Sequence, residues 1–429
     1  MTNLGGADSE ITGRDRRKWY VLGLLTAVYL LGLVDRSVIS VVVEPLKAEF
    51  HLSDKQVGML PTFFALAYGL LVLPMGWLAD RMERRVLLSV AVAIWSVLTG
   101  VCALSSNFLM LLAARIGVGA GEAPLTPASM SIIADTFPPS QRNTAVGILI
   151  SGPHIGQIVI FVCGGWLLMH FDWRMVFLVA CAPGLLLAGL LYFTVREPKR
   201  GIFDEPLVES SPKTPQSSAN NSVRDLLANP ALCYAILALA VGVGVGVTVV
   251  VWATSFMVRI HGLTVGHAAI STGLDFGICA AIGSLLIGPF ADRFSMRDPR
   301  KLVLIPAFST LMAFVGGSVM ILGPTFPIAL AGMSLLALTT GFFTSTGYSL
   351  VLSLSTPTQR GVTTGAMKMM SSLIGDVPMP FITGAISDAI GGPGSIRPAL
   401  LCTLTLMLVS SFLYARVYKI AGNRERGTP

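Results

Sequence analysis

Long apolar runs, separated by short polar loops, dominate the chain. Each run has at least the roughly twenty residues that an α-helix needs to cross the roughly 30 Å apolar core of a bilayer. The pattern therefore predicts membrane-spanning helices along nearly the whole length. Twelve runs are found, at about residues 19–45, 56–79, 86–105, 107–135, 142–169, 174–195, 231–258, 265–291, 302–323, 326–355, 361–390 and 398–418.

Composition strengthens this interpretation. Hydrophobic residues make up 53% of the chain and charged residues only 12%, about half the charged share of a soluble domain. The six cysteines lie in or beside apolar runs without a CxxC pair or a histidine cluster, which favours buried thiols over disulfides or a metal site. The net charge of +7 is spread over the loops and therefore does not indicate a nucleic-acid partner.

A polar segment rich in proline, serine and asparagine divides the runs into two groups of six. We expect a tail at 1–18, a first half at 19–195, a linker at 196–230, a second half at 231–420 and a tail at 421–429. GWLADRMERR at 76–85 and GPFADRFSMRDPRK at 288–301 occupy the same place in each half. Repeated halves with a substrate site near the midplane between them are typical of secondary transporters.

Basic residues predict the orientation of the helices. Of the 30 lysines and arginines, 22 fall on one face of the predicted bundle and 5 on the other (Lys47, Lys55, Arg174, Arg259 and Arg397). Lys and Arg concentrate on the cytoplasmic side of membrane proteins. We therefore expect both termini and the linker to be cytoplasmic in a multi-pass protein of the cell (inner) membrane.

The two repeated loops suggest a conformational latch. A glycine in each would allow close helix contact, and Asp80 and Asp292 could cap helices of the opposite half near Arg360 and Arg142. The alternative is that the arginines merely anchor the loops. The predicted latch residues are Gly76, Asp80, Arg81, Arg84, Gly288, Asp292 and Arg293.

Two charges lie inside the fourth run. Arg115 and Glu122 are seven residues apart, hence on one helix face and about 10 Å apart along the axis. Charge in hydrocarbon costs at least a few kcal/mol, so such residues are functional by default. The three glycines between them favour close approach of another helix. Pro124 and Pro127 then remove backbone donors and are expected to bend the helix.

Asp35 in the first run lies at a similar depth. Counting 1.5 Å per residue places Asp35 and Arg115 roughly 12–15 Å from the outer face, so an ion pair is expected. Glu122 falls near mid-membrane, where desolvation suits a proton acceptor unless Arg115 stays close. The alternative is a static structural ion network. Arg36 either competes for Asp35 or holds an anionic head group in a cavity.

These motifs resemble a known family. GWLADRMERR resembles the signature loop of the major facilitator superfamily, although Glu83 stands where that loop usually has glycine. LVDRSVISVVVEPLKAEFHLSDKQVG, RIGVGAGEAPLTPASMSIIADTFP and SSLIGDVPMPFITGAISD resemble the Spinster family within it. The resemblance implies an all-α fold of twelve helices in two pseudo-symmetric halves that rock to alternate access. It also implies lipid export, and proton coupling carried by Asp35, Arg115 and Glu122.

Other polar and aromatic residues within the runs are candidates for the substrate cavity. His154 and Asp275 reach similar depths and could pair across the halves; the alternative is that His154 bonds to a main-chain carbonyl. Asp376 is expected to stabilise a broken helix around Pro378. Lys368 meets either a lipid phosphate or a nearby acid. The substrate-facing candidates are Arg36, Phe63, Tyr68, Trp252, Phe256, Lys368 and Met369, with Phe64, Met367 and Met370 as further wall residues.

Together these observations predict a proton-driven transporter of lipids or amphiphiles that works as a monomer. No GxxxxGK[ST], HExxH or nucleophile elbow occurs, so neither ATP hydrolysis nor another enzymatic activity is expected, and no cofactor is expected. An organic-anion symporter using Arg36 and Arg115, and a multidrug antiporter, are alternatives of the same class. A receptor or scaffold is a further alternative, disfavoured by the intact intramembrane charges.

Overall fold

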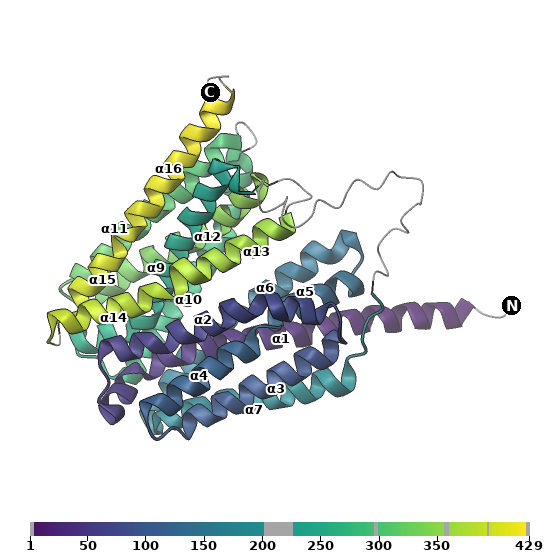
Figure 1. Ribbon diagram of the computed structural model, residues 1–429, viewed down its shortest axis with the longest axis horizontal. Coiled ribbons are helices and arrows are strands. Elements are labelled where there is room, and N and C mark those ends of the chain that lie inside the picture. The colour runs from purple at the N-terminus through teal and green to yellow at the C-terminus, as the bar shows by residue number, and fades with distance from the viewer. Residues whose placement is uncertain (1–3, 201–225, 296–298, 356–359, 393, 426–429) are drawn as a thin grey trace. The chain divides into compact units, whose positions relative to one another are not determined.

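The computed structural model describes residues 4–200, 226–295, 299–355, 360–392 and 394–425 (Figure 1). Within them the chain is helical and contains no strand. Twelve helical segments in this part of the chain are long and apolar enough to cross a membrane. The predicted all-α membrane fold is thereby confirmed.

Contacts divide the chain into two compact units. Unit 1 comprises Met1–Val38, Ala67–Ile160 and Phe171–Val208, and unit 2 comprises Ile39–Leu66, Phe161–His170 and Glu209–Pro429. The units depart from the predicted six-helix halves where parts of α1, α2 and α6 join unit 2. There α1 forms an ion pair with α9, α2 packs against α14, and α6 packs against α10. The helices are α1 (Leu4–Phe50), α2 (Asp54–Ala79), α3 (Arg84–Ala103), α4 (Phe108–Glu122), α5 (Leu125–Thr136), α6 (Pro139–His170), α7 (Trp173–Thr194), α9 (Pro230–His261), α10 (Val265–Ser295), α11 (Leu304–Leu322), α12 (Phe326–Ser353), α13 (Arg360–Met370), α14 (Pro378–Ile390), α15 (Ile396–Leu404) and α16 (Leu406–Glu425), with a short helix η1 (Pro299–Val303) and a π-helical turn η3 (Ser371–Asp376).

In unit 1, α3 packs closely against both α4 and α7 (Figure 1). Asn107 starts α4 by accepting a hydrogen bond from the main-chain nitrogen of Met110 at 2.9 Å. A Cβ atom on Gly121 would lie 3.3 Å from the main chain of Trp95 on α3. The glycines of α4 therefore let α3 approach, as predicted.

The fourth membrane span is broken in the middle. Helix α4 ends at Glu122 and α5 begins at Leu125, so Pro124 lies in the break. Proline has no N–H to bond the preceding turn, which explains the interruption. The interruption lies at the first of the two prolines expected to disturb this span, and it leaves Glu122 at the end of a helix rather than within one.

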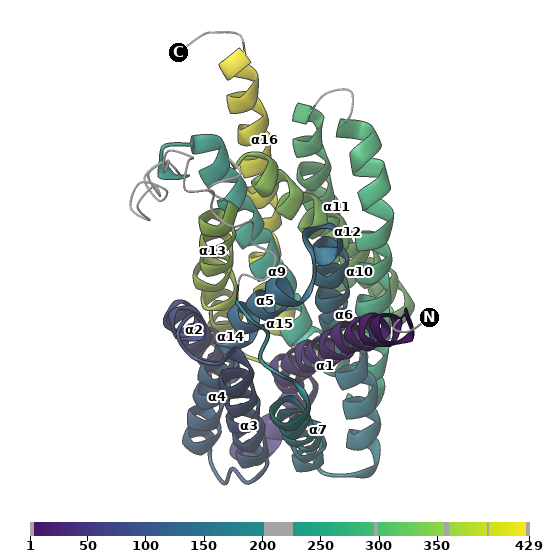
Figure 2. The ribbon, with the colours of Figure 1, turned by 90° about the vertical axis from the view of Figure 1, so that its right-hand side faces the viewer.

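In unit 2, α9 lies at the centre of the packing. It contacts α16, α12 and η3 (Figure 2), and most of its residues are buried. A Cβ atom on Gly244 would lie 2.3 Å from Cα of Gly375, so the two main chains pass without intervening side chains. The glycine-rich stretch of this helix therefore serves helix contact, as expected from its apolar surroundings.

The eleventh span is also interrupted. Between α13 and α14 the chain forms the π-helical turn η3, and the Val377 N–H donates to the Ser372 carbonyl at 2.9 Å. Pro378 follows at the first position of α14, where no N–H is needed. The expected break near Pro378 is present, and it brings Gly375 against α9.

We predict that Gly244→Ala destabilises the protein, because the added methyl group meets main-chain atoms that cannot move aside. Overpacking of this kind costs about 1–3 kcal/mol. Gly246→Ala, at another buried glycine of the same helix, is the matched control, since the nearest described atom to its Cβ would belong to Thr340, at 3.6 Å. Thermal unfolding in detergent should show a lower midpoint for Gly244→Ala alone; equal midpoints for the two variants would contradict the close contact.

Candidate functional site

A cluster of four charged residues lies inside unit 1, contributed by α1 and α4. Asp35 and Arg36 come from α1, and Arg115 and Glu122 from α4. Asp35 is 1% exposed, and Arg115 and Glu122 are both 0% exposed. Ionised groups are rarely buried without partners, so the contacts of these side chains decide what the cluster can do.

Asp35 is held from two sides. The Thr99 hydroxyl on α3 donates to Oδ1 of Asp35 at 2.7 Å. Nη1 of Arg115 donates to the main-chain carbonyl oxygen of Asp35 at 2.9 Å. The predicted proximity of Asp35 and Arg115 is thus present through this bond to the main chain, and the expected ion pair between the two side chains stays a prediction.

Glu122 is paired with Arg36, which neither alternative for Arg36 foresaw. Nε of Arg36 lies 2.8 Å from Oε2 of Glu122. The Arg36 side chain is 37% exposed, and its guanidinium stacks over the Tyr68 ring at 4.4 Å from the centroid. The Tyr68 hydroxyl lies 3.4 Å from Oγ1 of Thr126, at the start of α5. The pair therefore joins a buried acid to a cation at an open face.

Each of the two buried carboxyl groups keeps one oxygen unengaged. Oδ2 of Asp35 and Oε1 of Glu122 are buried and have no hydrogen-bond partner among the described residues. A buried carboxylate oxygen without a donor is costly, and protonation of the group removes its charge. The geometry thus leaves each acid a place to take up a proton.

The predicted wall residues have different environments. Trp252 and Phe256 are both fully buried in unit 2, and the Trp252 indole N–H donates to the Pro380 carbonyl at 3.4 Å. Neither side chain is exposed in this structure, and their assignment to a cavity wall stays a prediction. Phe63 and Met369 are half-buried.

The structure also shows the contacts of two polar candidates from the second half. Lys368 is exposed, with its ammonium 5.5 Å from the centre of the Tyr348 ring. Asp275 bonds to Ser334 on α12. The side chain of His154 lies outside the described part of the structure, so its predicted pairing with Asp275 stays a prediction.

The glycines of the predicted latch make no tight contact with the described residues. A Cβ atom on Gly288 would meet no described atom within 4 Å, and one on Gly76 would be 3.7 Å from Pro127. The latch itself stays a prediction. Asp80 and Arg293 are exposed, whereas the side chains of Asp292 and Arg360 lie outside the described residues.

Arg84 plays a role that the sequence did not indicate. Its side chain is 1% exposed, with an ion pair to Asp135 at the end of α5 and another to Glu197 at 2.7 Å, just beyond α7. Arg81 stacks instead over the Trp77 ring at 3.7 Å. Arg84 thus fastens the start of α3 to two other elements of unit 1.

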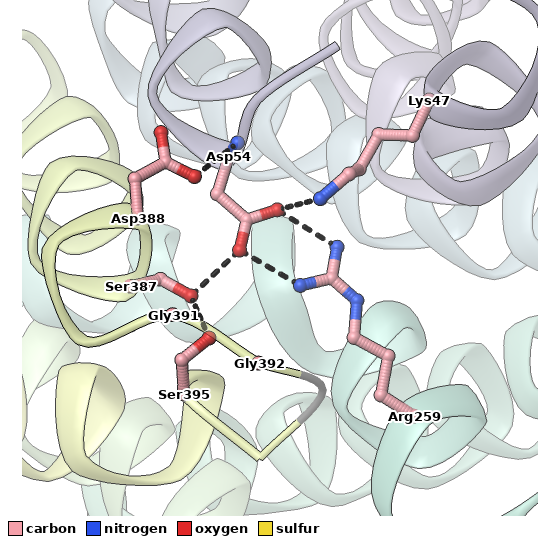
Figure 3. A pocket seen from close by; sticks show the side chains of 8 residues that line it. All are labelled: Lys47, Asp54, Arg259, Ser387, Asp388, Gly391, Gly392 and Ser395. Atoms are coloured by element: carbon pink, nitrogen blue, oxygen red, sulfur yellow. Dashed lines mark hydrogen bonds and ion pairs between the residues drawn. The ribbon is translucent and has the colours of Figure 1, made fainter. Parts of the chain in front are cut away.

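A second charged cluster, not predicted from the sequence, lies in unit 2 (Figure 3). Arg259 at the end of α9 binds both oxygens of Asp54, at 2.8 and 2.9 Å, and lies 2.7 Å from Glu44. Lys47 and the Ser387 hydroxyl also bond to the Asp54 carboxylate. The cluster borders a cavity of about 390 Å³.

Asp388 extends this cluster by capping a helix. Its two carboxylate oxygens accept from the main-chain nitrogens of Asp54 and Lys55, both at 2.8 Å. These are orphan donors at the start of α2, where an anion is favoured. A Cβ atom on Gly384 would lie 2.3 Å from the Asp54 carbonyl oxygen, so α14 approaches the end of α2 directly. The sequence offered one signal for this cluster: Lys47 and Arg259 were assigned to the same predicted membrane face.

We predict that Arg84→Gln destabilises unit 1, because it leaves Asp135 and Glu197 without their common partner. Breaking a buried ion pair on one side costs about 3–5 kcal/mol. Arg81→Gln is the control, because Arg81 lies three residues before Arg84 and is exposed, and it should change stability by about 1 kcal/mol or less. A thermal unfolding midpoint that falls equally in both variants would contradict the assigned role.

We predict that Asp54 and Arg259 act as an energetically coupled pair. Asp54→Asn and Arg259→Gln should each lower stability, and the double variant should lose less than the sum. The expected coupling is about 0.5–3 kcal/mol, as found for residues in direct contact. A double-mutant cycle of chemical or thermal unfolding measures it. Strict additivity would show that the contact carries no energy.

Comparison with known proteins places these features in a family. A model of the Major Facilitator Superfamily matches residues 25–375. An MFS-type efflux pump of Mycolicibacterium smegmatis is 26% identical over 409 residues, which cover 93% of this chain and 92% of that protein. A hexuronate transporter of Bacillus subtilis is 26% identical over 383 residues, covering 86% and 89%.

A solved structure is similar over almost the whole chain. It is a bacterial homolog to the human lysosomal transporter Spinster, in an inward-facing and unoccupied conformation. The TM-score is 0.86 at 29% sequence identity, covering 94% of this chain and 97% of the other. With twelve membrane-length helices and a family match over most of the sequence, the chain belongs to the major facilitator superfamily and is a relative of its Spinster proteins.

Proposed function

We propose that the protein is a proton-coupled secondary active transporter that moves a lipid or another amphiphile by alternating access. The observation that carries this proposal is the buried cluster of Asp35, Arg36, Arg115 and Glu122. Two acids are enclosed in a membrane-spanning unit, and each has one carboxylate oxygen without a partner among the described residues. Intramembrane acids of this kind are typical of proton relays in transporters.

Arg36 provides the link between the proton and the substrate. Its guanidinium is bonded to Glu122, yet more than a third of its side chain is exposed beside the Tyr68 ring. An anionic head group would compete with Glu122 for this guanidinium. Protonation of Glu122 removes that competition, so a proton and an anionic substrate favour each other's binding through Arg36.

The lipid assignment is supported by the relation to Spinster proteins and by the pairing of a cation with an aromatic face. Arg36 over Tyr68 offers charge to a phosphate and apolar surface to the adjoining chain. Phe63 and Met369 remain candidates for the acyl chain. The head group would then be fixed by few polar contacts, as expected for an amphiphile.

The Asp54 cluster supports the conformational part of the proposal. It joins the ends of α1 and α2 to α9 and α14 through ion pairs and the Asp388 cap. Alternating access requires contacts that form in one state and break in the other. We assign this cluster to the outer side, with both termini cytoplasmic in a bacterial inner membrane and the monomer as the working unit.

A second candidate function is favoured by one observation. The hexuronate transporter of Bacillus subtilis is similar over 86% of this chain. A small organic anion could use Arg36 as a carboxylate ligand, with co-transport of a proton on Glu122. This symporter shares the site but needs a polar cavity rather than an apolar one.

We predict that Glu122→Gln and Asp35→Asn each abolish pH-driven transport, because neither amide can take up and release a proton. The assay is movement of a labelled lysophospholipid in proteoliposomes with and without an imposed pH gradient. The gradient-driven rate should fall at least about tenfold, equivalent to about 1.4 kcal/mol. Asp172→Asn is the control, since this exposed acid caps α7 through an oxygen that asparagine retains.

Each result separates the alternatives. Full gradient-driven lipid movement in both variants would overturn the assigned proton site. Absence of lipid movement in the unmodified protein, with proton uptake triggered by a hexuronate instead, would establish the symporter. Lipid movement at the same rate with and without the pH gradient would support a lipid substrate and contradict proton coupling.

A further inference from the structure

Unit 2 contains an intramembrane acid that the proposed mechanism does not use. Asp275 lies on α10, ten residues after its start at Val265, hence about 15 Å along the helix. That distance is close to half of a roughly 30 Å apolar core. The side chain is half-buried, beside a stripe of exposed apolar residues that includes Leu274, Ile278 and Ile282. A permanent negative charge at this position would be costly.

The contacts of Asp275 come from hydroxyl and thiol groups. The Ser334 hydroxyl on α12 bonds to Oδ1 of Asp275, and Sγ of Cys279 lies 3.9 Å from the same oxygen. Oδ2 is buried and has no hydrogen-bond partner among the described residues. Asp275 thus shares with Asp35 and Glu122 the combination of one held oxygen and one open oxygen.

No cation in the described part of unit 2 is bonded to Asp275. Helix α12, packed against α10, carries no lysine, arginine or histidine. Helix α9 brings Arg259 and His261, and Arg259 is bound to Glu44 and Asp54. Within α10, His267 is bonded to Thr264. The remaining ionisable groups with described side chains on the elements packed here are Lys301 of η1, Tyr348 of α12, Cys233 and Tyr234 of α9, Arg293 of α10, and Arg142, Cys163 and His170 of α6. The side chains of His154, Asp292 and Arg300 lie outside the described residues.

The Ser334 hydroxyl has two acceptors but only one hydrogen. Its oxygen lies 3.0 Å from the Leu330 carbonyl oxygen and also contacts Oδ1 of Asp275. If Asp275 carries a proton, its O–H donates to Oγ of Ser334, and Ser334 donates onward to Leu330. Every polar hydrogen then has an acceptor. If Asp275 is ionised, the single Ser334 hydroxyl hydrogen can bond to only one of the two acceptors, and the other acceptor loses it.

We propose that Asp275, oriented by Ser334, is a second proton-binding site of this transporter, in a different unit of the chain from Asp35 and Glu122. The proton enters from water and leaves to water, and no other group is changed. The proposal deepens the proposed function by assigning an additional proton to the transport cycle. Asp54 provides the contrast, because both of its oxygens are bound by cations and no place for a proton remains.

The first test measures protonation directly and does not depend on transport. Infrared difference spectra of the purified, reconstituted protein over a pH series report the stretching band of protonated carboxyl groups. Asp275→Asn should remove one such band, and Asp275→Glu should restore a band at a shifted position. Spectra of Asp275→Asn that match the unmodified protein throughout would overturn the proposal.

A matched pair of variants tests the role of Ser334. Ser334→Ala should shift the Asp275 band, because the carboxyl O–H loses its acceptor. Ser284→Ala is the control, since Ser284 also lies between α10 and α12, and its hydroxyl bonds, among the described residues, to the Gly341 carbonyl at 3.5 Å. An unshifted band in Ser334→Ala, or an equal shift in Ser284→Ala, would show that Ser334 does not orient the acid. Unchanged thermal unfolding in each variant checks that the fold persists.

The second test counts protons during transport. In proteoliposomes with a pH-indicating dye, Asp275→Asn should lower the number of protons moved per substrate by one while substrate movement persists. An unchanged ratio would overturn the place of Asp275 in the cycle. If the unmodified protein moves no protons but its Asp275 band titrates, the proposed function fails and the proton-binding site stands, so the two failures are distinguishable.

Discussion

The cost of placing charge in an apolar interior governs the arrangement of this protein. An ionised group taken out of water needs a counter-charge or several hydrogen bonds, and each of these must come from a neighbouring helix. Arg84 meets this requirement with two acids and carbonyl oxygens contributed by elements beyond α3. Arg259 meets it with Glu44 and Asp54. These pairings tie neighbouring helices together in addition to their apolar contacts.

The acids of the membrane-spanning segments divide into two kinds by this criterion. Asp54 is bound at both oxygens by cations and a hydroxyl, so its negative charge is fully compensated. Asp35 and Glu122 each have one bonded and one open oxygen. The first arrangement suits a fixed negative charge that holds helix ends together. The second suits a group whose charge changes when a proton arrives.

Interrupted helices place these groups where neighbouring residues can reach them. The break after Glu122 separates α4 from α5 and brings Thr126 near Tyr68 and Arg36. The π-helical turn before Pro378 similarly lets Gly375 meet α9. In a membrane, such irregular main chain is tolerated where other protein segments cover it. Both breaks therefore lie in well-packed regions, and prolines adjoin both.

The sequence alone determined the membrane class, the spans, the break at Pro124, the helix contacts at the glycines of α4 and α9, and the intramembrane charges. These features depend on local composition and on the covalent geometry of proline and glycine. Only the tertiary structure decided which groups these cations bond to. Arg36 pairs with Glu122, Arg115 bonds to a main-chain carbonyl, and Arg259 pairs with Asp54, 205 positions away in the sequence. It also buried Trp252 and Phe256. A uniformly apolar helix carries little information about its rotation, so packing against its neighbours selects which side chains meet.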